Sequence, residues 1–110
     1  MAELRDNAAR AAALLKSMAN PSRLLILCSL ADGEKAVGQL VGAVGASQSG
    51  LSQHLAVLRR ENLVATRREA QSIFYSLASK EAEAVMATLY QVFCAKGTKR
   101  DPARLRGRFA

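Results

Sequence analysis

The sequence predicts a mainly α-helical domain that carries one small β-hairpin. Over most of residues 3–63 and 79–94, apolar side chains recur every three or four positions, which is the helical period. Between these stretches, residues 64–77 change to short runs of strand-forming residues with an alternating pattern. A chain of 110 residues has room for one hydrophobic core. We therefore expect one folded domain over residues 1–95, with about five helices.

The first two helices differ in how their apolar residues are arranged. The helix over residues 3–18 has a narrow apolar seam at spacings of four, three, four and three: Leu4, Ala8, Ala11, Leu15 and Met18. Such a seam suits packing against another helix, in the same chain or in a second copy. The next helix begins at Asn20-Pro21, where asparagine caps well and proline suits the first helical position, and it ends near Asp32-Gly33. Because it is apolar nearly all round, we expect it at the centre of the domain.

A helix-turn-helix pattern follows. Residues 37–44 form a short helix, Gly45-Ala46 forms the turn, and Ser47 caps a longer helix that ends near Leu63. One side of the longer helix is a leucine stripe: Leu51, Leu55 and Leu58. Its other side begins with short polar residues and ends with arginines, which suits a DNA major groove, although a solvated helix also has a polar outer face. The candidate DNA-contacting residues here are Gln48, Ser49, Ser52, Gln53, His54, Arg59 and Arg60.

Two short strands are predicted next, over residues 64–68 and 72–77. Their link contains no glycine, so the turn chemistry of a hairpin is weak. A helix-turn-helix followed by a two-stranded hairpin is a winged helix-turn-helix. Arg67 and Arg68 in this wing, and Gln71 near its tip, are further candidates for phosphate or minor-groove contacts. Two arginines on an exposed strand also suit protection of a sheet edge.

The last helix begins at Ser79, which is a favourable cap, and runs to about Cys94. It has a broad apolar face: Val85, Met86, Leu89, Tyr90, Val92 and Phe93. Together with the first helix it offers more apolar surface than a small winged helix can cover. We therefore expect a homodimer joined through the first and last helices.

The net charge of +7 is distributed unevenly. Residues 96–110 hold six basic residues and one acidic residue, so their net charge is +5, whereas residues 1–95 carry only +2. We expect residues 96–110 to be a basic, mobile tail that adds phosphate contacts. No apolar run approaches the roughly 20 residues of a membrane span, and no signal peptide is visible at the start. A cytoplasmic protein is the expectation.

Few residues here suit catalysis or metal binding. Two cysteines and one histidine do not form a metal-ligand pattern, and the chain has no Cys-x-x-Cys motif, phosphate-binding loop or paired carboxylates. We therefore expect no catalytic residue, no metal and no cofactor, and a protein that is not an enzyme. Cys28 lies among leucines and suits a small buried hydrophobe, whereas Cys94, close to Lys96, suits an exposed thiol. From this chemistry alone, a thiol switch and two inert cysteines both stay open.

Three segments resemble the ArsR/SmtB family of bacterial winged-helix repressors. These are residues 18–27 (Met-Ala-Asn-Pro-Ser-Arg-Leu-Leu-Ile-Leu), residues 48–59 (Gln-Ser-Gly-Leu-Ser-Gln-His-Leu-Ala-Val-Leu-Arg) and the wing over residues 64–77. The resemblance covers about residues 8–95. It implies a homodimer, joined by its first and last helices, that binds palindromic double-stranded operator DNA.

The resemblance is not to the metal sensors of that family. Ala36-Val37-Gly38 stands where arsenic and cadmium sensors have a Cys-x-Cys pair, and the last helix lacks the histidine ligands of the zinc sensors. Cys28 and Cys94 instead resemble, by position, the cysteine pair of the reactive-sulfur branch, the BigR and SqrR type. That likeness implies a repressor whose sensor thiols are linked by persulfides through a di- or polysulfide, which releases the DNA.

Four other functions stay open from the sequence. Two lie in the same family: a repressor that responds to peroxide or electrophiles, and a haem-responsive member. A third is a small thiol enzyme that uses Cys94, although no nearby base or second cysteine supports it. The fourth is a constitutive DNA-binding module with inert cysteines.

Overall fold

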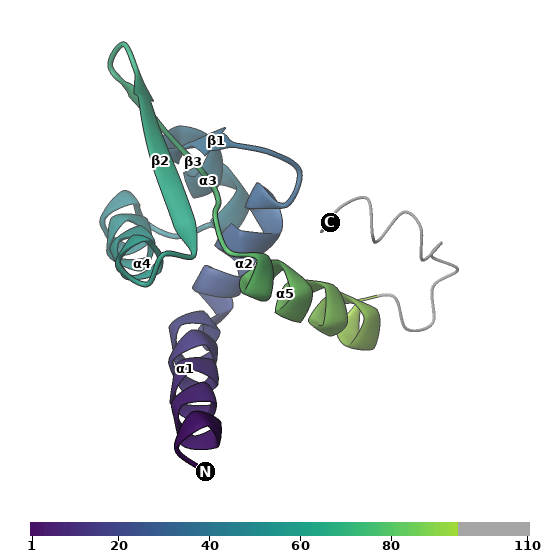
Figure 1. Ribbon diagram of the computed structural model, residues 1–110. Coiled ribbons are helices and arrows are strands. Elements are labelled where there is room, and N and C mark those ends of the chain that lie inside the picture. The colour runs from purple at the N-terminus through teal and green to yellow at the C-terminus, as the bar shows by residue number, and fades with distance from the viewer. Residues whose placement is uncertain (95–110) are drawn as a thin grey trace.

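The computed structural model describes residues 1–94, and residues 95–110 are not described further; the predicted basic tail lies among them. Five helices and three strands follow in the order α1 (Ala2–Met18), α2 (Pro21–Leu30), β1 (Lys35–Ala36), α3 (Val37–Val44), α4 (Gln48–Arg60), β2 (Val64–Glu69), β3 (Ser72–Leu77) and α5 (Lys80–Phe93) (Figure 1). This is the predicted winged helix-turn-helix, with α3 and α4 as the helix pair and β2 and β3 as the wing. Among the described residues, no helix is long and apolar enough to cross a membrane.

The hydrophobic core lies where α2, α3 and α4 meet. Seven large side chains there are fully buried: Ile26, Leu27, Leu40, Leu51, Leu55, Leu58 and Leu63. Burying one leucine or isoleucine contributes about 1.5–3 kcal/mol, so these side chains dominate the stability of the fold. The predicted leucine stripe of α4 is confirmed, because all three of its members face this core.

Side-chain caps begin three of the helices at the predicted residues. Asn20 Oδ1 accepts hydrogen bonds from the backbone N–H groups of Ser22 (2.8 Å) and Arg23 (3.1 Å) at the start of α2. Ser47 Oγ accepts from the N–H of Gly50 at 3.1 Å, and Ser79 Oγ accepts from the N–H of Ala82 at 3.0 Å. Each bond satisfies a donor that the first helical turn leaves unpaired, so these residues set where the helices start.

The end of α4 is closed by a left-handed residue. Asn62 has a φ of 62°, its N–H donates to the carbonyl of Arg59 (3.0 Å), and the N–H of Leu63 donates to the carbonyl of Leu58 (2.9 Å). These are the two bonds of a Schellman motif, and the buried pair Leu58 and Leu63 supplies its hydrophobic contact. The motif ends the helix and directs the chain into β2.

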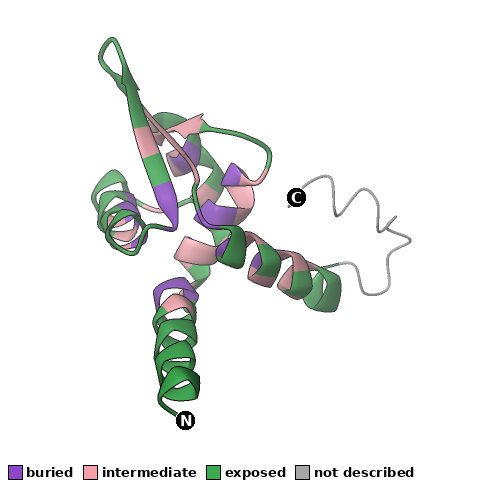
Figure 2. Ribbon diagram, in the orientation of Figure 1, coloured by how far each residue is buried: buried purple, intermediate pink, exposed green. Residues whose placement is uncertain are grey.

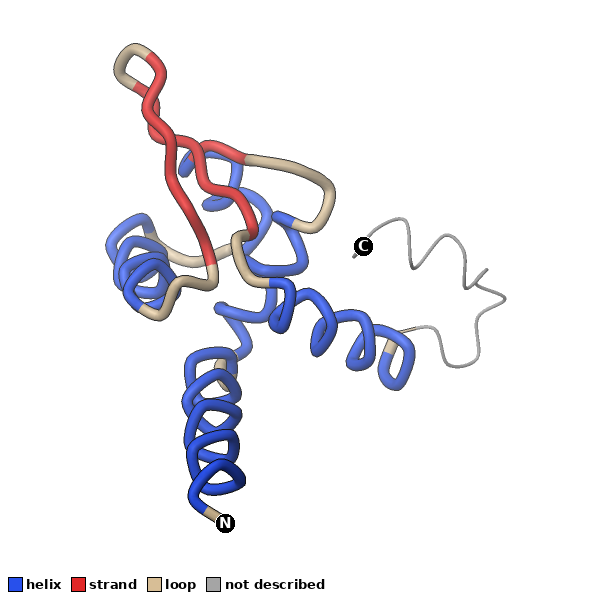
Figure 3. Tube along the Cα trace, viewed as in Figure 1, coloured by secondary structure: helices blue, strands red, loops and turns tan. Residues whose placement is uncertain are grey.

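The wing is part of a three-stranded antiparallel sheet with the strand order β1-β3-β2. The hairpin pairs Val64 with Leu77 through to Glu69 with Ser72, so its loop is the two residues Ala70 and Gln71 (Figure 3). Ala70 has a φ of 57°, a conformation that favours glycine, so the weak turn signal in the sequence reflects a non-glycine residue at a strained position. The two-residue strand β1 was not predicted, since two residues carry no periodic pattern.

The apolar surfaces of α1 and of the end of α5 are not covered by other residues in the range 1–94. In the seam of α1, Met18 is buried, but Leu4 is 62% exposed and Leu15 is 53% exposed (Figure 2). At the end of α5, Phe93 is 76% exposed. Helix α2 contributes Ile26, Leu27 and Leu30 to the core, as expected of a central helix, but Leu25 is 48% exposed because that side of α2 faces outward beside α5.

Candidate DNA interface and thiol groove

The face of α4 opposite the core is polar and open. Leu51, Leu55 and Leu58 fix the helix against the core, so the polar residues on its opposite side point outward. Six of the predicted DNA-contacting residues of α4 are exposed: Gln48, Ser49, Ser52, Gln53, Arg59 and Arg60. Short hydrogen-bonding side chains thus occupy the N-terminal half, and two cationic ones lie in the last turn. This arrangement is suited to reading base edges and contacting the flanking phosphates.

His54 lies apart from this open face. It is half-buried, and its Nδ1 lies 3.4 Å from Nη1 of Arg23 on α2. Arg23 also donates from Nε to the backbone carbonyl of Ser17 at the end of α1, at 2.5 Å. The side chains of Arg23 and His54 therefore link α1, α2 and α4. Sequence reasoning missed Arg23, because its partners lie 6 and 31 residues away in the chain.

The two arginines of the wing are placed differently. Arg67 donates to both carboxylate oxygens of Glu34 and to Glu69, and its guanidinium lies 4.8 Å from the centroid of the Phe74 ring. These hydrogen bonds raise the pKa of Arg67 above its usual range and lower the pKa of Glu34. Arg68 is the next residue in the strand and is exposed, as is Gln71 in the hairpin loop.

A hollow of about 410 Å³ lies between α4 and the wing. Its lining is Ser52, Ala56, Arg59, Arg60 and Tyr75. Tyr75 therefore lies on the side of the wing that faces α4, although the sequence suggested it only as one member of an alternating strand. The two arginines give this hollow a positive rim.

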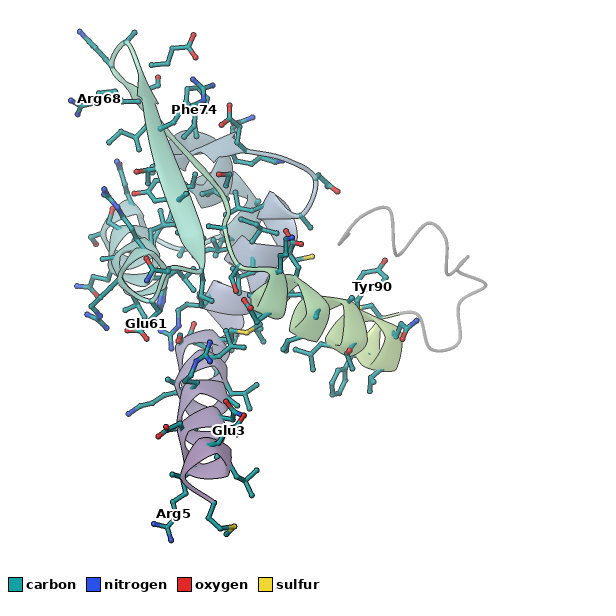
Figure 4. The ribbon with its side chains drawn as sticks, viewed as in Figure 1. Glu3, Arg5, Glu61, Arg68, Phe74 and Tyr90 are labelled. Carbon is teal, nitrogen blue, oxygen red and sulfur yellow. The ribbon has the colours of Figure 1, made fainter. Side chains whose placement is uncertain are left out.

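The two cysteines line one groove between α2 and α5. Cys28 is half-buried on the third turn of α2, and Cys94, which follows α5, is exposed; both are thiols here. The groove has a volume of about 470 Å³, and its lining is otherwise almost wholly apolar: Pro21, Leu24, Leu25, Met86, Leu89, Tyr90 and Phe93. Tyr90 is labelled on α5 in Figure 4. Residues separated by 66 positions in the sequence thus meet at one surface. Within residues 1–94, no three His, Cys, Asp or Glu side chains are grouped as a metal site requires.

Comparison with known proteins decides the family. The model described as "Bacterial regulatory protein, arsR family" matches residues 20–66, which span α2 to the first half of β2. The transcriptional activator HlyU of Vibrio cholerae is 52% identical over 92 residues, covering 84% of this chain and 85% of that protein. The chain belongs to the ArsR family of bacterial regulatory proteins.

Other ArsR relatives and solved structures agree. The biofilm growth-associated repressor of Agrobacterium fabrum is 46% identical and covers 84% of this chain and 79% of its own length. The structure of reduced HlyU from Vibrio cholerae superposes with a TM-score of 0.81 at 51% identity, covering 86% and 99% of the two chains. The repressor BigR from Xylella fastidiosa gives a TM-score of 0.79 at 40% identity, covering 86% and 96%. The chain is therefore a DNA-binding transcriptional regulator.

Proposed function

We propose that this ArsR-family regulator is a homodimeric repressor that senses reactive sulfur species through Cys28 and Cys94. The observation that carries the proposal is that both thiols line one apolar groove, one at the core helix α2 and one at the end of α5. A bond between them would join α2 and α5 covalently. Relatives named as an activator and as a repressor both occur, so the direction of regulation is itself part of the proposal.

The dimer is inferred from uncovered apolar surface. Leu4 and Leu15 lie on one seam of α1, and Val92 and Phe93 end α5; each is more than half exposed. Water-exposed leucine and phenylalanine in this number favour burial against a second copy. A twofold axis would then place two α4 helices in successive major grooves, whose half-sites lie about 34–36 Å apart.

The DNA contacts that we propose come from α4 and the wing. Exposed polar residues in the first half of α4 would read base edges, and Arg59 and Arg60 would bind phosphate. His54 is half-buried beside Arg23, so its part in binding would be at the margin of this face. Gln71 lies in the hairpin loop, where it can approach a minor groove.

The sulfur chemistry can be written with balanced atoms. Two thiols and one persulfide RSSH give a disulfide, RSH and H₂S. Two thiols and two RSSH give a trisulfide, two RSH and H₂S, because each thiol first takes one sulfane sulfur and one of the resulting persulfides then displaces hydrosulfide from the other. A disulfide needs Cα atoms about 4.4–6.8 Å apart, and each inserted sulfur extends the bridge by about 2 Å. A more distant pair would therefore select persulfide over peroxide.

The test is a DNA-binding titration with mass spectrometry on the same samples. Reduced protein, glutathione persulfide-treated protein and peroxide-treated protein are compared on a duplex that the reduced protein selects from a random pool. We expect persulfide to join Cys28 to Cys94 within one chain and to weaken binding, and peroxide to do neither. After persulfide treatment the Cys28→Ser and Cys94→Ser variants should stay bound, whereas Ser29→Ala, a matched control on α2 that keeps both thiols, should be released like the wild type.

Each other outcome supports a different function. Release by peroxide would indicate a peroxide-responsive thiol regulator. Binding that no oxidant changes would indicate a constitutive DNA-binding module. Catalytic turnover of the persulfide with unchanged DNA binding would indicate a thiol enzyme.

A further inference from the structure

Arg67 lies at the centre of a cluster on one face of the wing. Its Nη2 donates to Glu34 Oε1 at 2.5 Å, its Nε to Glu34 Oε2 at 3.1 Å, and its Nη1 to Glu69 Oε2 at 2.6 Å. All three guanidinium nitrogens therefore donate to carboxylates, and the guanidinium also lies over the Phe74 ring. We call Glu34, Arg67, Glu69 and Phe74 the wing clamp.

The wing clamp spans the whole sheet. Arg67 lies on the edge strand β2 opposite Phe74 of the central strand β3, and Phe74 in turn pairs with Ala36 of β1. Glu34 comes just before β1, so Arg67 reaches across β3 to the far edge. Only two residue pairs join β1 to β3. The clamp is thus a second attachment of the projecting hairpin to the segment that leads into α3.

Arg68 points the other way. Adjacent residues in a strand project to opposite faces, so Arg68 shares its face with Thr66 and with Tyr75, the residue paired with Thr66. Tyr75 lines the hollow that Arg59 and Arg60 of α4 also line. Figure 4 shows Arg68 and Phe74 on opposite sides of the wing. Arg68 therefore lies on the side of the wing that faces α4, and the clamp lies on the other side.

The charge balance of the wing clamp also separates the two arginines. One guanidinium and two carboxylates carry a net charge of −1, which repels rather than attracts a phosphate. Arg68 forms no ion pair within 4.0 Å among the described residues. The hydrogen bonds from Arg67 lower the pKa of Glu34 and so favour its ionised form.

We propose that Arg67 is a positioning residue that holds the wing at a fixed orientation to α4, and that Arg68 is the wing arginine that contacts phosphate. This rests on the proposed DNA contacts and revises the expectation that both arginines bind DNA. A planar guanidinium suits the clamp because it grips one carboxylate with two parallel donors and still reaches a second, which an ammonium group cannot do.

The clamp is first tested without DNA, so that its result does not depend on the DNA contacts. Amide hydrogen exchange is measured in wild type, Glu34→Gln, Arg67→Met and the charge-matched control Glu83→Gln on α5. We expect faster exchange over residues 66–75 in the first two variants, and unchanged exchange in α4. Unchanged exchange of the wing would overturn the clamp.

DNA affinity is then measured at several salt concentrations on the duplex selected by the wild type. Arg68→Met should flatten the plot of log K against log salt by about 0.9, which is about eightfold in affinity at 0.1 M salt. Arg67→Met and Glu34→Gln should leave the slope unchanged and weaken binding at least about twofold, because half or more of the population then has a misplaced wing. Their double variant should be no weaker than either single variant.

Two results would show instead that Arg67 contacts phosphate. The first is tighter binding by Glu34→Gln, because this substitution releases the arginine and removes a negative charge. The second is a lower salt slope in Arg67→Met. Lysine substitutions separate the two roles again. Arg67→Lys keeps the charge but loses the two parallel donors of the guanidinium, so we expect it to bind as weakly as Arg67→Met. Arg68→Lys should bind like wild type. Wild-type affinity in Arg67→Met would also overturn the proposal. Failure of the wild type to bind any duplex would refute the proposed DNA contacts and leave the exchange result standing.

Discussion

Large apolar residues at helical spacing are buried in the helix-turn-helix but exposed on the two outer helices, α1 and α5. In α3 and α4, leucines at helical spacing are fully buried, as Leu40, Leu55 and Leu58 show. On α1 and at the end of α5, Leu4 and Phe93 occur at the same spacing but are mostly exposed. The difference indicates that one chain completes the core behind α4, whereas the other described residues leave apolar faces of the outer helices uncovered, which is the basis of the proposed homodimer.

The largest expected effect comes from the core. Leu58→Ala removes a fully buried side chain and should lower the free energy of unfolding by about 2–5 kcal/mol. Urea denaturation followed by circular dichroism measures it. Leu15→Ala changes a side chain that is 53% exposed, so its effect should appear only at concentrations where the dimer forms. An equal, concentration-independent loss in both variants would contradict the contrast between the regions.

The next effect is on assembly. Replacing Leu4 and Phe93 by glutamate in one protein should give a monomer in sedimentation equilibrium, because two charges would be placed in the apolar interface. The melting temperature should then no longer rise with protein concentration. Ala9→Glu adds a charge to α1 away from the seam and serves as the control. A dimer that survives the double substitution would place the interface elsewhere.

A smaller effect is expected where α4 meets the wing. Asn62→Ala should destabilise the protein by about 1 kcal/mol, because alanine tolerates the left-handed conformation poorly. Asn62→Gly should be neutral or stabilising. Chemical denaturation of the two variants side by side gives the comparison. If alanine and glycine are equivalent here, the Schellman motif does not contribute to stability as described.

The smallest effect concerns acid and the wing clamp. The pKa of Glu34 is depressed in the folded state, so its contribution is present above the unfolded-state pKa and is lost as the pH falls through the folded-state value. Titration of the Glu34 carboxyl by carbon-13 NMR should therefore show a midpoint below that of an ordinary glutamate. In Arg67→Met the midpoint should rise toward the ordinary value. Identical midpoints in the two proteins would mean that Arg67 does not hold Glu34.

Much of the fold follows from neighbours in the chain. The leucine stripe of α4, the caps at Asn20, Ser47 and Ser79, and the alternation in β3 were all readable, because each depends on residues a few positions apart. The exposed polar face of α4 was predictable for the same reason. The short strand β1 was not, because only its pairing with β3 makes it a strand.

The candidate sites depend on contacts between residues that are far apart in the sequence. Sequence alone treated Arg67 and Arg68 as equivalent, and it placed Cys28 and Cys94 together only through a resemblance. Tertiary structure separated the arginines, since Glu34 lies 33 residues before Arg67, and it brought both thiols to one groove. The sequence by itself determined the helices, their caps and their apolar faces, because these depend on local spacing. Which distant side chains meet was decided only when the helices and the wing packed together, because such contacts depend on how whole elements are oriented in space.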